Sequence, residues 1–144
     1  MINKILNSFD QINIQRLDHI GIVVKNIPTA LETYKENLSL NDFTEIFEDP
    51  IQGVRVVFIS IQNSSRIELI EAIDGESKII QFSDNGGGLH HICFEVPNLS
   101  ATLQRTRAMG AVTVCEPVPA VAFQNRNIAF IYTREKQLIE FVET

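Results

Sequence analysis

Two kinds of side chain that bind metal ions recur at a spacing of 72 residues in this chain of 144. The imidazoles are His19 and His91, and the carboxylates are Glu68 and Glu140. Each glutamate lies in an otherwise apolar segment, where a charged group is costly to bury unless it is paired or bound to a cation. Two imidazoles and two carboxylates suit a divalent ion such as Zn, Mn, Co, Ni or Fe, with positions left for water or substrate. The sequence therefore predicts one metal site from these four residues.

The same spacing relates the two halves of the chain as a whole. Twelve of the 55 positions from 17 to 71 carry the residue that is found 72 positions later, whereas unrelated residues would match at roughly one position in 16. Several unmatched pairs are apolar in both halves. This pattern predicts two copies of one motif related by a pseudo-twofold axis, which would bring the two histidines together and the two glutamates together.

Each copy is predicted to form a strand, a helix and three further strands. The first copy has these elements at 17–24, 28–38, 43–47, 54–61 and 66–71, and the second at 89–96, 99–109, 113–116, 127–132 and 137–142. We expect an N-terminal arm at 1–16, modules at 17–82 and 89–144, and a linker at 83–88. The glycines at 86–88 precede a strand and not a helix, so they are interpreted as linker and not as a phosphate cradle.

Other polar residues near the predicted metal site are predicted to have supporting or structural roles. Strand alternation places His90 on the face opposite His91, so His90 is predicted to be a supporting or structural residue. Cys93 shares the face of His91 and is predicted to be a small residue lining the pocket, not a nucleophile. Glu71 and Glu143 also recur but face the other side, which indicates a solvated or helix-facing role.

The composition excludes several classes of partner. The net charge is −6 with no basic cluster, which argues against nucleic acid and anionic membrane surfaces as partners. No apolar run is long enough to span a bilayer, and the first residues do not resemble a secretory signal. We therefore expect a cytoplasmic protein whose two cysteines are free thiols.

Four motifs, LDHIGIVVKNI, RIELIEA, GLHHICFEV and QLIEFVE, resemble the vicinal oxygen chelate superfamily of glyoxalase I, extradiol dioxygenases and bleomycin-binding proteins. The resemblance covers residues 17 to 143, and QGVRVVFISI and GGGLHHICFEVPNL are most similar to its methylmalonyl-CoA epimerase branch. It implies an α+β fold in which two paired βαβββ modules form an open-sided mixed β-sheet cavity. It also places the metal ligands on His19, Glu68, His91 and Glu140, and it implies a homodimer.

The resemblance implies a metal-dependent isomerase or lyase that moves the α-proton of an acyl thioester, with methylmalonyl-CoA or a related acyl-CoA as substrate. Glu140 is the candidate base, because a carboxylate beside the metal is positioned to take the proton. The second proton-transfer residue stays open. The alternatives are a lactoylglutathione lyase of the glyoxalase I type, which performs a similar proton shift, and a metal-free small-molecule-binding protein of the bleomycin-resistance type.

Overall fold

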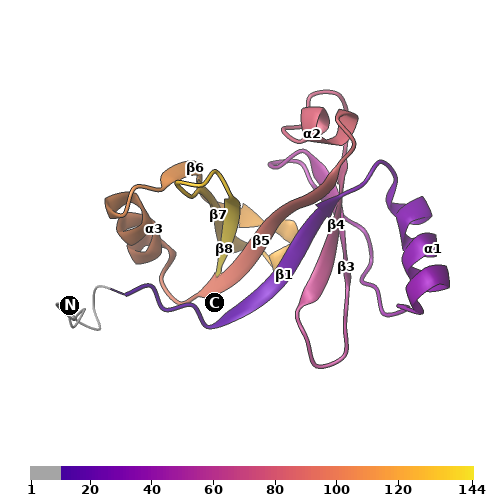
Figure 1. Cartoon of the computed structure of the whole chain (residues 1–144), viewed down its shortest axis with the longest axis horizontal. Coiled ribbons are helices and arrows are strands. Elements are labelled where there is room, and N and C mark those ends of the chain that lie inside the picture. Colours follow the sequence, from indigo (N-terminus) through magenta and orange to yellow (C-terminus); the bar gives the residue numbers. More distant parts are fainter. Residues whose placement is uncertain (1–10) are drawn as a thin grey trace.

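The computed structural model describes residues 11–144, whose strands form one curled, mixed eight-stranded sheet with the order β2-β3-β4-β1-β5-β8-β7-β6 (Figure 1). The strands are β1 (Arg16–Val23), β2 (Phe47–Asp49), β3 (Val54–Ile59), β4 (Arg66–Ala72), β5 (Gly88–Val96), β6 (Val112–Ala120), β7 (Arg126–Tyr132) and β8 (Leu138–Glu143). The helices are α1 (Ile27–Leu38), α2 (Ile80–Asp84), α3 (Leu99–Ala108) and the 3₁₀ turn η2 (Val121–Phe123). The predicted α+β class and the paired modules are confirmed.

The register of the sheet carries the pseudo-twofold relation. β1 and β5 run antiparallel side by side at the centre, with Gly21 opposite His91 and His19 opposite Cys93 (Figure 1). On the outer sides β1 pairs in parallel with β4 and β5 pairs in parallel with β8. The four strands that carry the predicted site are therefore neighbours in the order β4-β1-β5-β8.

The two longer helices begin in the same way in both copies. Side-chain oxygens of Asn26 and Asn98 each accept a hydrogen bond of 2.9 Å from the amide three residues later, as N-cap residues do. The carboxylates of Glu71 and Glu143 accept from the first helical amides at 3.2 and 2.8 Å. The recurring pair is thus helix-facing, one of its two predicted roles. No helix within residues 11–144 is long and apolar enough to cross a membrane.

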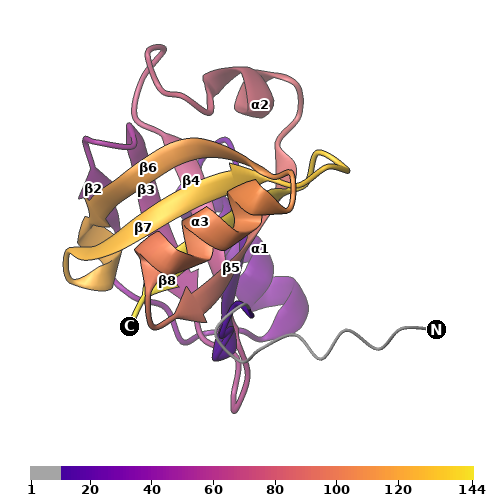
Figure 2. The same ribbon diagram turned by 90° about the vertical axis from the view of Figure 1, so that its left-hand side faces the viewer.

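The sheet separates an outer and an inner apolar layer. On the outside, α1 packs on β3 and β4 through a cluster that includes Leu69, and α3 packs on β5, β7 and β8 through one that includes Leu103. On the inside, Phe58 of β3 packs against Phe123 of η2 with ring centroids 5.6 Å apart. Figure 2 shows β6 and β7 of the second copy crossing β3 and β4 of the first in this view, as expected for a sheet that curls around its inner side.

The main differences from the predicted elements concern two strands and two short helical segments. The sequence prediction ended the sixth strand at 116, but β6 extends to Ala120. β6 lies at the edge of the sheet, where prolines such as those at 117 and 119 are tolerated. The predicted strand at 43–47 is wrong, since Phe43 makes only an isolated bridge and β2 is at Phe47–Asp49. α2 and η2 were not predicted, because each is at most five residues long. Most of the predicted arm at 1–16 lies outside the described residues.

Candidate metal centre

Four side chains from the four central strands converge on one point. His19 Nε2 on β1 and His91 Nε2 on β5 lie 3.1 Å apart. Glu140 Oε1 on β8 lies 3.0 and 3.2 Å from these two nitrogens, and Glu68 Oε1 on β4 lies 3.5 Å from both. All four residues are buried. The structure thus brings together every residue of the predicted site, and the pairs meet as the repeat requires.

The arrangement of these atoms fits a divalent ion. Glu140 Oε1 is fully buried without a well-directed hydrogen bond and lies 3.0 and 3.2 Å from the Nε2 atoms of His19 and His91, at the common point. Atoms bound to one ion at about 2.1 Å are separated by about 3.0 to 3.4 Å at adjacent coordination positions. The observed separations of 3.0 to 3.5 Å match this range. His19, Glu68, His91 and Glu140 could therefore hold a metal ion through nitrogen and oxygen.

The electrostatics of the cluster favour a positive charge at the same point. Burial lowers the pKa of His19, but the charges of Glu68, Asp18 and Glu140 outweigh it and raise the pKa to about 10. Burial likewise raises the pKa of Glu140, but the imidazoles of His19 and His91 bring it well below its ordinary value. A divalent cation would take the place of protons at this centre.

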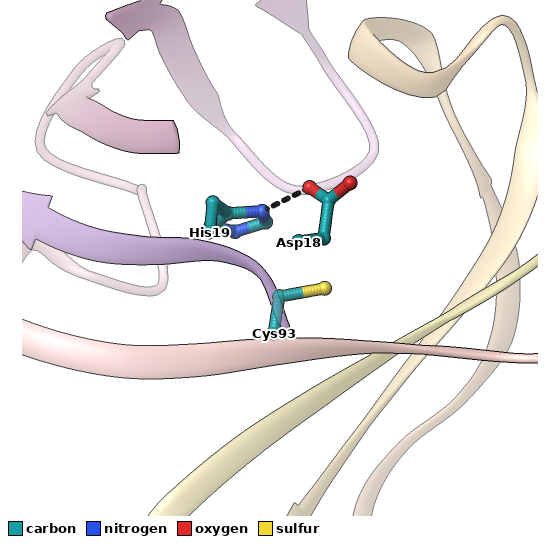
Figure 3. Close-up of side chains that lie close together, drawn as sticks. All are labelled: Asp18, His19 and Cys93. Carbon is teal, nitrogen blue, oxygen red and sulfur yellow. Dashed lines mark hydrogen bonds and ion pairs between the residues drawn. The ribbon is translucent and has the colours of Figure 1, made fainter. Parts of the chain in front are cut away.

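Asp18 fixes the orientation of His19 (Figure 3). Its Oδ2 lies 2.7 Å from His19 Nδ1, which engages this nitrogen in a hydrogen bond and leaves Nε2 facing the centre. Arg66 Nη2 lies 3.0 Å from the same oxygen, and its guanidinium carbon lies 3.8 Å from the ring centroid of Phe58. Burial raises the pKa of Asp18, but His19 and Arg66 outweigh it and lower the pKa to about 2.

Cys93 belongs to the apolar core. It comes from β5, beside Asp18 and His19 of β1 (Figure 3), and the three form a second group close enough to bind a metal. His19 Nδ1 is already engaged by Asp18, and burial together with the charge of Glu140 raises the pKa of the Cys93 thiol well above its usual value. A protonated thiol is a poor metal ligand and nucleophile. Cys93 packs with Phe58 and is not among the cavity-lining residues, so its predicted pocket-lining role is wrong.

His90 does not lie on the face opposite His91, and that prediction is wrong. Gly21 of β1 pairs with His91 of β5, and the next residue, Ile22, pairs with Leu89. His90 therefore has no partner on β1 and is the extra residue of a β-bulge. A bulge interrupts the alternation of faces. His90 Nδ1 lies 2.8 Å from His91 Nδ1, and its ring lines the cavity. Burial and the proximity of His91 lower the pKa of His90 to about 4.

Gly21 leaves room for the imidazole of His91. A Cβ atom at this position would lie 2.3 Å from His91 Cε1, which no side chain can accommodate without moving the ring. Glycine is needed where another group approaches the backbone this closely. This role could not be predicted from the repeat, because the repeat pairs Gly21 with a cysteine.

We expect Gly21→Ala to weaken metal binding, because the added methyl group displaces His91 Nε2 from the centre. Overpacking of this kind also lowers the free energy of unfolding, by about 1–3 kcal/mol. Equilibrium dialysis with Zn²⁺ and thermal unfolding measure the two effects. Gly75→Ala is the matched control, since a Cβ there meets nothing within 4 Å. Equal zinc affinity in the two variants would contradict this role.

A cavity of about 220 Å³ opens beside the four converging side chains. Its walls are mainly apolar and come from both copies, with Val56 and Ile70 on one side and Ile128 and Phe130 on the other. Its polar lining includes the following residues: Asp49, Gln52, Glu68, Lys78, His90, His91 and Glu140. Gln52 Nε2 is buried without a hydrogen-bond partner, which leaves a donor for a bound molecule. A small, partly polar ligand can therefore reach the candidate metal centre.

Comparisons with known proteins agree with this architecture. Residues 18–130 match the family described as the glyoxalase/bleomycin resistance protein/dioxygenase superfamily. The chain is 28% identical to the mitochondrial methylmalonyl-CoA epimerase of Dictyostelium discoideum, covering 98% of this chain and 86% of that protein. It is 29% identical to the ethylmalonyl-CoA/methylmalonyl-CoA epimerase of Cereibacter sphaeroides, covering 85% and 91%. The solved methylmalonyl-CoA epimerase of Mycobacterium tuberculosis has 30% identity and a TM-score of 0.80, covering 90% of this chain and 88% of that one.

Proposed function

Because the chain belongs to the glyoxalase/bleomycin resistance protein/dioxygenase superfamily, we propose that it is a metal-dependent acyl-CoA epimerase acting on methylmalonyl-CoA or a close relative. The observation that carries this proposal is the convergence of His19, His91, Glu68 and Glu140 beside a cavity built from both copies. The epimerases among the relatives support the choice of reaction. The proposal keeps the expected homodimer and cytoplasmic location.

Epimerisation needs removal of the proton on the carbon between the thioester and carboxylate groups, followed by its return to the opposite face. A divalent ion held by the four residues would act as a Lewis acid that draws electron density from two substrate oxygens and makes this proton easier to remove. The residues themselves must bind and orient the acyl group and transfer the proton. The position of the carboxylates at the cavity wall suits that task.

Glu140 is our candidate for the group that takes the proton. Its Oε1 faces the common point, and its carboxylate lines the cavity. Glu68 is its equivalent in the first copy, reaches the same centre from β4 and also lines the cavity. Two carboxylates that approach one centre from opposite modules can serve opposite faces of a planar substrate carbon. We propose that Glu68 is the second proton-transfer residue.

The remaining cavity residues suit a small anionic acyl group. Gln52 offers a buried N–H without a partner, which can donate to a carbonyl or carboxylate oxygen. Within residues 11–144, Lys78 is the one lysine or arginine that lines the cavity, and it favours a negatively charged ligand. Val56, Ile70 and Phe130 give the cavity apolar walls that would limit water around the reacting carbon. Electrostatic interactions are stronger in such a site than in bulk water.

The test is to incubate the metal-loaded protein separately with (2S)- and (2R)-methylmalonyl-CoA and to follow their interconversion by resolving the isomers. Ethylmalonyl-CoA and the glutathione hemithioacetal of methylglyoxal are assayed beside them. We expect interconversion of the acyl-CoA isomers. Turnover of the hemithioacetal alone would favour the lactoylglutathione lyase, and binding without metal or turnover would favour the bleomycin-resistance type. Either result would contradict the proposal.

A further inference from the structure

The two central strands carry β-bulges at positions related by the repeat. In β1, Leu17 and His19 face consecutive residues of β5, so Asp18 is the extra residue. In β5 the extra residue is His90, which lies 72 positions after Asp18. Each bulged residue directly precedes one of the two histidines of the centre. A bulge redirects the side chain of the inserted residue, and bulges are common beside active sites.

Both bulged residues contact the same atom of the histidine that follows. Asp18 Oδ2 lies 2.7 Å from His19 Nδ1, and His90 Nδ1 lies 2.8 Å from His91 Nδ1. An imidazole that binds a metal through Nε2 carries its proton on Nδ1. His91 Nδ1–H then donates to the lone pair of His90 Nδ1, and His90 keeps its own proton on Nε2. The geometry of the second contact thus reproduces that of the first with a different acceptor.

We propose that His90 is a positioning residue that fixes the tautomer and ring orientation of His91, as Asp18 does for His19. This inference rests on the metal centre of the proposed function. It assigns unequal partners to two equivalent ligands, since His19 is supported by a carboxylate held by Arg66 and His91 by an imidazole. A carboxylate partner raises the basicity of a histidine ligand. His91 should therefore bind the metal ion less strongly than His19 does.

His90 also packs against Phe82 of α2, with ring centroids 4.9 Å apart and nearly perpendicular planes. Packing alone could make a substitution at this position harmful, so the test must separate packing from hydrogen bonding. The repeat indicates which substitution to use, because Asp18 shows that an aspartate in the equivalent bulge reaches Nδ1 of the next histidine. Aspartate restores the acceptor at position 90 but not the aromatic contact with Phe82.

The experiment measures zinc affinity by competition with a chromophoric chelator in the full chain. We expect His90→Ala to bind Zn²⁺ about 10–100-fold more weakly than the unaltered protein, the usual cost of removing a partner of a metal ligand. His90→Asp should restore the affinity to at least that of the unaltered protein. Phe82→Leu, which keeps the hydrogen bond and removes the aromatic contact, should bind zinc as the unaltered protein does.

Unchanged affinity in His90→Ala, or equal weakening in His90→Ala and His90→Asp, would overturn the positioning role while leaving the metal centre intact. A Phe82→Leu variant as weak as His90→Ala would overturn it in favour of packing. Failure of the unaltered protein to bind zinc or another divalent ion would overturn both the metal centre and this inference. Because no substrate is present in the assay, a wrong substrate assignment does not affect the outcome.

Discussion

Glu140→Gln is expected to slow interconversion of the methylmalonyl-CoA isomers by about 10²–10⁴-fold, the usual contribution of a positioned acid or base. The amide keeps an oxygen at the same position but cannot take a proton. Interconversion needs both proton transfers, so blocking one carboxylate stops it whichever isomer is supplied. The measurement is the rate at which each pure isomer approaches the equilibrium mixture.

Glu143→Gln is the matched control, because it makes the same chemical change three residues along β8 on a side chain that faces α3. We expect it to lower stability slightly and to retain activity. Glu68→Gln should stop interconversion as Glu140→Gln does. If Glu68 and Glu140 serve opposite faces, each variant still exchanges the proton of one isomer with solvent, and the two variants spare different isomers. Full interconversion by Glu140→Gln would exclude Glu140 as the base.

His91→Ala is expected to lose metal binding almost entirely, because it removes one of the two nitrogen donors of the centre. The unaltered protein should hold about one divalent ion per chain after dialysis. Elemental analysis of dialysed samples gives the stoichiometry. The loss should exceed that in His90→Ala, since His90 contacts Nδ1 of His91 and not the converging Nε2.

Leu89→Ala controls for disturbance of β5, as Leu89 is exposed on the same strand. It should bind metal like the unaltered protein. Equal losses in His91→Ala and His90→Ala would contradict the assignment of ligand and positioning residue. Absence of metal from the unaltered protein after incubation with Zn²⁺, Co²⁺ and Mn²⁺ would contradict the centre itself.

The repeat explains why four distant residues could be predicted to meet. Identical residues at equivalent positions must lie close to a pseudo-twofold axis when their strands flank it, and His19 and His91 satisfy this condition on β1 and β5. Glu68 and Glu140 follow because β4 and β8 pair with those strands in parallel. The helix caps at Asn26 and Asn98 follow from local sequence alone.

The features that could not be predicted depart from regular strand geometry or from residue identity between the two copies. A single inserted residue shifts the alternation of a strand, and Asp18 and His90 differ in type, so no identity marked the two bulges. The role of Gly21 depends on how closely the His91 ring crosses a neighbouring strand, which strand periodicity does not encode. The length of β6 depended on its place at the sheet edge, which only the assembled fold defines.

The most direct test of the account is solvent deuterium incorporation at C2 of methylmalonyl-CoA, followed by mass spectrometry in deuterium oxide. We predict that the protein loaded with a divalent ion incorporates one deuterium at C2, that chelation stops the exchange, and that returning the ion restores it. Exchange at the same rate before and after complete removal of the metal would contradict the metal-assisted mechanism. No exchange by the loaded protein would contradict its assignment as a methylmalonyl-CoA epimerase.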